Sequence, residues 1–296
     1  MKVCPDCNRI VSAVDAVSIG GRYYHRSCRT CCRCGKLILG RRELFGEKPC
    51  HPECASQPVT CSICGKSIRR YREDFWGNIA CPEHAHKCFY CGRFLSPATR
   101  GGGQLSIPAA SSHKIWICGL CKDTLVTTSG QVEECRSAVM SVFRKNGITG
   151  IPEDIPIRLS EFRDAGRRAG GLVLGNNRGR ISPSRSRYSC EIKIYFQLPR
   201  LVFCGVLAHE LLHSWLALYA IHLPDEEKEG FCNLGESLIL QQDSSLFGAY
   251  RIARMNEDPD PVYGDGFRLM ADRLSKLGWK GLMDALLWEG RKTGGR

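Results

Sequence analysis

One short motif in the sequence has the residue types and spacing of a catalytic zinc site. His209, Glu210 and His213 form the pattern H-E-x-x-H. Two histidines four residues apart on a helix lie about 40° apart around its axis, so both imidazoles can bind one zinc ion. Glu210 lies beside them, where its carboxylate can accept a proton from a water molecule on the zinc ion. The motif therefore predicts catalytic zinc ligands at His209 and His213 and a general base at Glu210.

A zinc site of this kind needs a third protein ligand and keeps one position open. The extended motif that adds a glycine and a third histidine on the same helix is absent after His213. His222 would lie on the opposite face of the helix. By analogy with zincins in which a second helix supplies a glutamate, we expect Glu229 to be the third ligand. Glu236 is the alternative, either as a ligand or as a hydrogen-bond partner of the site.

The first 121 residues contain a different metal-binding pattern. Thirteen of the nineteen cysteines, together with three histidines, lie in pairs with two residues between their members. Each pair supplies two ligands to a tetrahedral zinc ion, and in a reducing compartment such cysteines are zinc thiolates and not disulfides. Cys50 could take the place of His51 as a zinc ligand, although His51 keeps the two-residue spacing to Cys54. Cys32 lies between ligands and is not expected to bind zinc. The four expected structural zinc sites are Cys4, Cys7, His25 and Cys28; Cys31, Cys34, His51 and Cys54; Cys61, Cys64, Cys81 and His84; and Cys88, Cys91, Cys118 and Cys121.

Hydrophobic periodicity predicts the elements that must position the catalytic motif. Residues 199–223 begin with a proline and end before Pro224, and their apolar residues lie on every face, which predicts one buried helix. The acidic segment after Pro224 has a helical stripe and predicts a second helix. A third helix is expected over 130–146, and strands are expected from Ile155 and from Cys190. The basic, serine-rich segment between the two strands is expected to be a solvated loop.

The composition is that of an ordinary globular chain. Of 296 residues, 43% are hydrophobic and 24% are charged, and no run of 18 uncharged apolar residues occurs, so we expect no membrane span. The N-terminus lacks the apolar core of a secretory signal, so a cytoplasmic location is expected. Residues 1–128 hold 19 Lys and Arg against 9 Asp and Glu, a net +10, and residues 129–296 hold 23 against 21, a net +2. Zinc thiolates would remove much of the first charge, so nucleic acid is not an expected partner.

Longer stretches around these residues resemble one known family. The segments LPRLVFCGVLAHELLHSWLAL, EEKEGFC and YGDGFRLMADRLSKLGWKGLMDAL are similar to the peptidase region of the plant LIM-domain ubiquitin-activated peptidases that limit organ growth. HPECASQPVTCSIC and the closing CGLC resemble the zinc-finger half of that family. The resemblance implies an α+β fold class, with a LIM domain over 1–58, a LIM-like zinc-finger module over 59–125 and a zincin-like metallopeptidase domain over 130–296. It also implies five zinc ions, four structural and one catalytic, with Glu210 as the catalytic glutamate.

The same resemblance bears on partners and on two further residues. It implies protein substrates, and ubiquitin or ubiquitinated proteins as partners, although plant members carry ubiquitin-interacting helices ahead of the LIM domain and this chain opens on Cys4. Tyr263 and Asp265 match a family motif and are expected either to cap the last helix or to hydrogen-bond at the active site. The strand from Cys190 is expected to form a cleft edge on which an extended substrate adds. The zinc-finger half is expected to pack directly against the peptidase domain.

The leading functional expectation is an intracellular zinc endopeptidase whose LIM modules select or restrain its substrates. The first alternative is a LIM-domain adaptor with an inactive peptidase-like domain. The second is a zinc-finger protein that binds nucleic acid. Metal content separates the endopeptidase from the adaptor, because a catalytic zinc adds a fifth ion to the four of the fingers.

Overall fold

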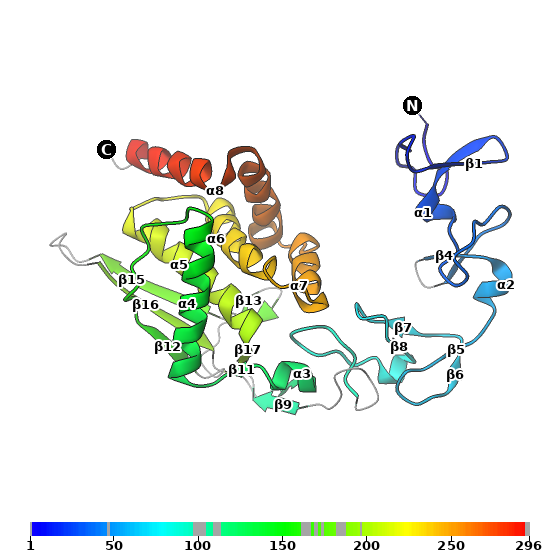
Figure 1. Ribbon diagram of the computed structural model, residues 1–296, viewed down its shortest axis with the longest axis horizontal. Helices are drawn as coiled ribbons and strands as arrows, with labels where there is room; N and C mark the ends of the chain where they lie inside the picture. The colour runs from blue at the N-terminus through cyan, green and yellow to red at the C-terminus, as the bar shows by residue number, and fades with distance from the viewer. Residues whose placement is uncertain are drawn as a thin grey trace. The chain divides into compact units, whose positions relative to one another are not determined.

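The computed structural model describes the helices and strands of most of the chain (Figure 1). The chain divides into two units, one ending at His86 and the other beginning at Lys87. The fourth cysteine cluster, from Cys88 to Cys121, therefore lies in the second unit, and the expected LIM-like module over 59–125 spans the division. The described residues are 2–45, 48–96, 105–108, 114–160, 167–168, 171–172, 175–181, 188–195 and 197–293.

The first unit consists of short antiparallel hairpins, each followed by a single turn of helix or by the next hairpin. Its apolar contacts are few: Val11, Val17 and Tyr24 surround one cysteine cluster, and Ile38 lies at the next. Cores this small do not stabilise a chain without metal or disulfides, so metal binding must supply folding free energy here. The elements are β1 (Ala16–Ile19), β2 (Arg22–His25), α1 (Arg26–Arg29), β3 (Glu43–Phe45), β4 (Lys48–Cys50), α2 (Pro52–Ala55), β5 (Val59–Thr60), β6 (Ser67–Ile68), β7 (Arg72–Glu73), β8 (Ile79–Ala80) and η1 (Pro82–His84).

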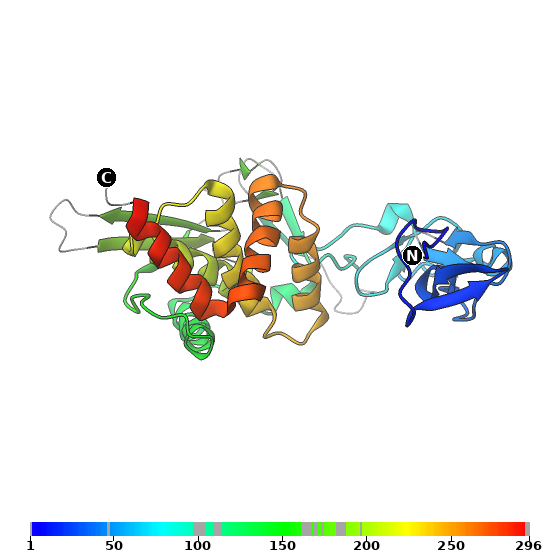
Figure 2. The ribbon, with the colours of Figure 1, turned by 90° about the horizontal axis from the view of Figure 1, so that it is seen from above.

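The second unit combines a small mixed sheet with a group of longer helices. The sheet order is β12-β16-β15, with β12 parallel and β15 antiparallel to the central β16. Helix α5 packs against β15 and β16 and also against α6, and α6 in turn packs against α8 (Figures 1 and 2). Its elements are β9 (Leu105–Pro108), β10 (Lys114–Ile117), α3 (Gly119–Lys122), β11 (Leu125–Val126), α4 (Ser129–Lys145), β12 (Ile157–Ser160), β13 (Arg167–Arg168), β14 (Gly171–Leu172), β15 (Gly175–Ile181), β16 (Tyr188–Tyr195), β17 (Leu198–Pro199), α5 (Arg200–Leu218), α6 (Asp225–Leu240), α7 (Leu246–Asn256), the π-helix η3 (Pro261–Asp265) and α8 (Gly266–Thr293).

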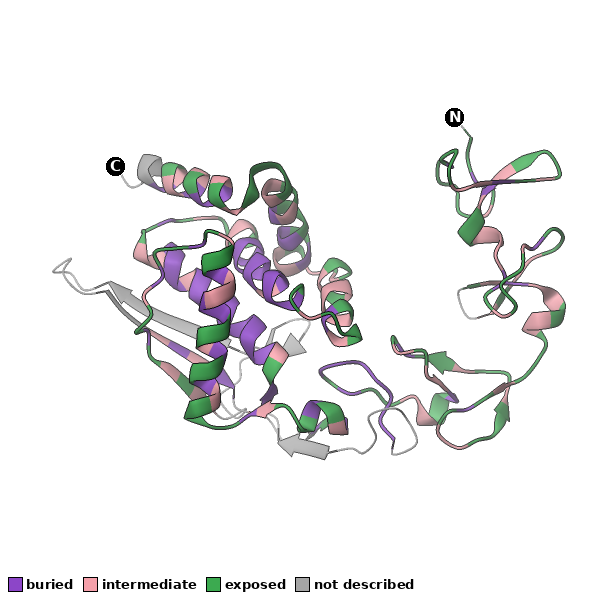
Figure 3. Ribbon diagram, in the orientation of Figure 1, coloured by how far each residue is buried: buried purple, intermediate pink, exposed green. Residues whose placement is uncertain are grey.

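The expected helices around the motif are present. Helix α4 begins after a capping box, in which the Thr128 side chain accepts from the backbone of Gln131 and the Gln131 side chain accepts from the backbone of Thr128. Most residues of α5 and α6 are buried (Figure 3). Helix α5 ends at Leu218 and not at residue 223 as expected, because Ala220 has a φ of 51° that no α-helix accommodates.

Two sequence expectations about strands are wrong. The basic segment from Asn176 to Tyr188 was expected to be a solvated loop, but residues 176–181 lie in strand β15 and Tyr188 begins β16, while residues 182–187 lie outside the described part of the chain. The strand from Cys190, which the structure describes as β16, was expected at a cleft edge. It is the central strand, paired on both sides, so its backbone groups are already occupied. The edge next to α5 belongs to β15.

Helix α5 is the one helix in the described ranges with the length and apolar character to cross a membrane, with a mean hydropathy of 1.6. In the structure, 78% of that apolar window is buried inside the second unit. Packing against the sheet and α6 accounts for its composition, since a helix enclosed on all sides is apolar on all sides.

Candidate metal centres

The four cysteine pairs that open the expected zinc sites share one backbone geometry. In each pair the residue after the second cysteine has a positive φ, which favours glycine or asparagine. Its N–H donates to the carbonyl of the first cysteine at 2.8–3.0 Å. The four residues with positive φ, between 57° and 72°, are Asn8, Gly35, Gly65 and Gly92. The turn places both sulfur atoms on the same side of the backbone.

The side chains of each expected structural site lie together, with all ligand atoms of a group within 4.8 Å of one another. The Cys88 and Cys121 sulfurs are 3.7 Å apart, as are those of Cys91 and Cys118. Four sulfurs around a zinc ion at about 2.3 Å would be roughly 3.8 Å apart, so the spacing fits tetrahedral zinc. The groups are those predicted: Cys4, Cys7, His25, Cys28; Cys31, Cys34, His51, Cys54; Cys61, Cys64, Cys81, His84; and Cys88, Cys91, Cys118, Cys121.

In the first two groups, a backbone carbonyl oxygen lies beside the histidine nitrogen that does not face the cysteines. His25 Nδ1 faces Cys7 Sγ at 3.3 Å, while its Nε2 lies 3.0 Å from the carbonyl oxygen of Ile10. His51 repeats this arrangement, with Nε2 3.2 Å from the Leu37 carbonyl oxygen. A carbonyl that accepts from Nε2–H leaves Nδ1 as the free lone pair for a metal ion.

The two cysteines that sequence left open take different positions. Cys50 is fully buried, with its sulfur 3.6 Å from that of Cys31, but it is not in the four-atom group that includes His51. Burial, with hydrogen bonding to Cys31 as the next cause, raises the pKa of Cys50 to about 12. A neutral Cys50 thiol can donate a hydrogen bond to the sulfur of Cys31, so Cys50 is placed to stabilise that expected ligand. Cys32 is exposed.

The H-E-x-x-H histidines and Glu229 form a separate group, which we call the helix site. His209 and His213 lie on α5, and Glu229 lies on the neighbouring α6. The two histidine Nε2 atoms are 3.0 Å apart, and Glu229 Oε2 lies 3.3 and 3.4 Å from them. Three ligand atoms of a tetrahedral zinc at about 2.0–2.1 Å would be roughly 3.3 Å apart. The donor set and its spacing therefore fit one zinc ion.

Electrostatics at Glu229 agree with this fit. Its Oε2 is buried and makes no well-directed hydrogen bond within the described part of the chain. Burial acts to raise the pKa of Glu229, but the adjacent rings of His209 and His213 outweigh burial and lower the pKa far below its usual range. A buried carboxylate oxygen held beside two imidazole nitrogens is costly unless a cation shares the site.

Glu210, which follows His209 on α5, is also buried, at 5% exposure. Burial raises the pKa of the Cys232 thiol on α6, and the charges of Glu229 and Glu210 raise it further. Both glutamates therefore lie near Cys232 of α6. Glu236, the alternative ligand, is placed elsewhere: its carboxylate pairs with Arg251 of α7 at 2.8 Å.

Glycines bring the two ligand-bearing helices into close contact. A Cβ added at Gly235 of α6 would lie 2.7 Å from Leu212 of α5. A Cβ added at Gly230, next to Glu229, would lie 2.1 Å from the carbonyl oxygen of Gly266 at the start of α8. Asn233 of the same helix donates to the Tyr263 carbonyl at 3.2 Å. The segment that contains Tyr263 therefore holds α6 where it carries Glu229.

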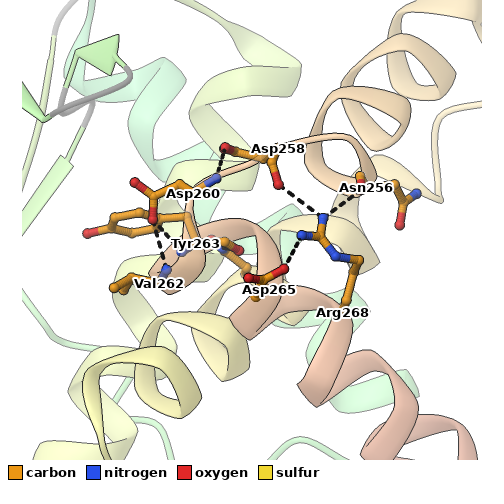
Figure 4. A network of polar contacts seen from close by, with 8 residues as sticks. Asn256, Asp258, Asp260, Val262, Tyr263, Asp265 and Arg268 are labelled. Atoms are coloured by element: carbon orange, nitrogen blue, oxygen red, sulfur yellow. Dashed lines mark hydrogen bonds and ion pairs between the residues drawn. The ribbon is translucent and has the colours of Figure 1, made fainter.

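Figure 4 shows what holds that segment in turn. Arg268 donates to the carbonyl oxygens of Asn256 and Asp258 at 2.7 and 3.0 Å, and it pairs with Asp265. The Asp260 side chain accepts from the backbone of Tyr263 at 3.0 Å. Asp265 thus binds Arg268 within the turn that leads into α8. Sequence reasoning missed Asp260, Arg268 and the glycines, whose role depends on contacts distant in sequence.

Comparison with known proteins gives a consistent picture. The family model described as "DA1-like: Protein DA1" matches residues 174–245. Protein DA1-related 2 of Arabidopsis thaliana is 24% identical, over 96% of this chain and 68% of that protein. LIM domain-containing protein HDR3 of Oryza sativa subsp. japonica is 22% identical, over 99% and 74%. Protein DA1 of Arabidopsis thaliana is 23% identical, over 98% and 68%. The resemblance expected from the sequence is confirmed over nearly the whole chain.

Proposed function

Because the chain aligns with Protein DA1 and its relatives over nearly its whole length, and because its donor atoms fit zinc, we propose that it is a zinc-dependent endopeptidase. The proposal gives the second unit a zincin-like fold and gives His209, His213 and Glu229 to the catalytic zinc. The observation that carries it is the helix site itself. Three donor atoms lie at zinc spacing, two of them on α5, which also carries the buried Glu210, and the third on α6.

The chemistry follows from the residues present. Zinc bound at this site would supply a Lewis acid that activates water and polarises a peptide carbonyl. His209 and His213 would hold the metal through their imidazole nitrogens, and Glu229 would add a carboxylate ligand. Glu210 takes the proton of the attacking water at its carboxylate and passes it to the nitrogen of the leaving amine.

Substrates are proposed to be extended segments of proteins. Among the described strands, β15 forms the edge of the sheet beside α5, so a substrate strand would pair with its backbone there. In the first unit, LIM-type fingers would recognise partner proteins, with ubiquitin or ubiquitinated proteins among them. A reducing cytoplasm suits a chain with thirteen cysteines in metal-binding groups.

Glu210→Gln in the full chain tests the function. The variant is expected to bind five zinc ions per chain, like the wild type, and to lose cleavage of a fluorescently labelled unfolded casein, because an amide cannot accept the proton. Glu133→Gln, which changes an exposed glutamate of α4, is the control and should cleave normally. Unchanged cleavage by Glu210→Gln would refute the assignment. Four zinc ions and no cleavage by the wild type would favour an adaptor.

A further inference from the structure

The fourth cysteine cluster differs from the other three in its surroundings. All four of its cysteines are buried, whereas each of the other groups includes at least two members that are not. Tyr90, which lies between the first two of these cysteines, is completely buried. Its hydroxyl donates to the carbonyl of Gln197 at 3.3 Å, a contact that spans 107 residues of sequence. A finger that served only as a spacer would not need such contacts.

One side of this cluster holds the start of α5. The chain leaves Cys121 through three residues and forms β11, which pairs with β17 directly before α5. The N–H of Gln197 donates to the Val126 carbonyl at 3.1 Å, and the N–H of Arg200, the first residue of α5, donates to the Thr124 carbonyl at 2.7 Å. His209 follows nine residues later on the same helix, about 14 Å along its axis.

The other side of the cluster holds α7. Gly92, whose φ is 71°, has no room for a side chain, because an added Cβ would lie 2.4 Å from Cζ of Tyr250. Next to Tyr250 on α7, Arg251 pairs with Glu236 of α6. Helix α6 carries Glu229, and a Cβ on Gly205 of α5 would meet Glu236 at 3.0 Å. The cluster therefore contacts the chain directly before α5 and also contacts α7, which pairs with α6.

We propose that the fourth cysteine cluster positions the helix site, so that metal binding at the two places is energetically coupled. The inference rests on the proposed function, since it concerns the metal that the helix site would hold. Zinc at the cluster holds together the described segments 88–96 and 114–126, and these segments contact the chain before α5 and the side chain of Tyr250 on α7. Tyr90 and Gly92 act as positioning residues, because Tyr90 contacts Gln197 just before α5 and Gly92 contacts Tyr250 of α7. Coupling of this kind is reciprocal: metal at the helix site must stabilise the cluster by the same factor.

Gly92→Asn and Gly65→Asn are a matched pair for the test. Asparagine tolerates a positive φ, and Asn8 already occupies this position in the first group, so both changes leave the turn intact. At Gly65 nothing lies within 4 Å of an added Cβ, whereas at Gly92 the Tyr250 ring must move. Any difference between the variants therefore reports the contact with α7 and not the turn.

The experiment measures affinity at the helix site in the full chain. Mild chelation empties that site while four zinc ions stay on the cysteine groups, and Co²⁺ is then titrated well below the unfolding temperature. Co²⁺ bound at the helix site has no sulfur ligand, so its absorption spectrum lacks the sulfur-to-metal charge-transfer bands of a thiolate site. The spectrum therefore shows whether Co²⁺ binds at the helix site or at a cysteine group. Gly92→Asn is expected to raise the Kd for Co²⁺ at least tenfold, as outer contacts of metal sites do. Gly65→Asn is expected to leave it unchanged.

Each outcome has a distinct meaning. Equal Kd values in wild type, Gly65→Asn and a folded Gly92→Asn with four zinc ions would overturn the coupling. If Gly92→Asn loses the fourth zinc or aggregates, Tyr90→Phe takes its place, since it removes only the hydroxyl that reaches Gln197. A Kd unchanged in Tyr90→Phe, with zinc release from the cysteine groups equally fast with and without Co²⁺, would then overturn it. If the wild type shows no Co²⁺ spectrum of the kind that lacks thiolate bands, its helix site binds no metal, and the proposed function itself is refuted.

Discussion

Gly230→Ala tests how closely the position of α6 controls the helix site. An alanine Cβ at this position would lie 2.1 Å from the Gly266 carbonyl oxygen and 2.9 Å from Met270 Cγ. Ordinary contacts between carbon and oxygen are near 3.2 Å, so α6 and the start of α8 must separate by about 1 Å. The residue before Gly230 is Glu229, so the displacement passes directly to a proposed metal ligand.

Two opposing effects decide the sign of the stability change. Alanine is favoured over glycine inside a helix by about 0.5–1 kcal/mol. Overpacking of a close contact costs about 1–3 kcal/mol. The second effect wins, and we expect a net loss of about 1–2 kcal/mol in the free energy of unfolding. Metal affinity should fall further, because metal–ligand distances tolerate only about 0.2 Å and the shift is about 1 Å.

The assay combines urea unfolding with metal titration at the helix site. A tenfold or larger rise in Kd is expected, which corresponds to at least about 1.4 kcal/mol. Gly130→Ala is the matched control, since this helical glycine of α4 has nothing within 4 Å of an added Cβ and should gain slight stability. A folded Gly230→Ala with wild-type stability and wild-type affinity would refute the argument that close approach of α8 fixes Glu229.

Four further outcomes are expected. His213→Ala should lose the fifth zinc and all cleavage while the four cysteine groups keep theirs, as measured by metal analysis of the purified variant. A chelator should remove the zinc of the helix site first, because three protein ligands hold it instead of four, and the time course of zinc release will show one fast equivalent and four slow ones. Acidification should release that same equivalent before the cysteine groups release theirs, because three protein ligands hold it instead of four, and pH-dependent metal content measures this. A fragment that begins at Lys87 should fold, whereas one that begins at Asp123 should not, as judged by near-ultraviolet circular dichroism and resistance to protease, because the latter leaves Gln197 and Tyr250 without their partners.

The parts of the fold that depend on neighbouring residues were predictable from sequence. Helix α4 followed from its apolar stripe, and the structure adds the capping box of Thr128 and Gln131, which the prediction did not use. The cysteine pairs predicted metal groups because two residues between ligands define the turn that holds both sulfurs. The pairing of His209 with His213 followed from the helical repeat alone.

Contacts between segments that are distant in sequence could not be predicted from local residue patterns. Strand β15 is polar and lacks an apolar alternation, so its pairing with β16 left no signal in its own residues. Glu229 was reached only by analogy, because no local pattern says which acidic residue of α6 faces α5. The spacing of the fourth cluster predicted its ligands but not its neighbours, since the contacts of Tyr90 and Gly92 lie 107 residues and more away.

The contacts of the fourth cluster also have a consequence for synthesis on the ribosome. Residue 92 is made 158 residues before Tyr250, the side chain that covers it. At about 5–20 residues per second, this interval lasts about 8–30 s. Zinc can bind the four cysteines as soon as Cys121 emerges, but Tyr90 then stays exposed until residue 197 and the helices beyond it arrive. The nascent chain thus presents an apolar aromatic surface on an already rigid finger, which is the kind of site that ribosome-associated chaperones bind.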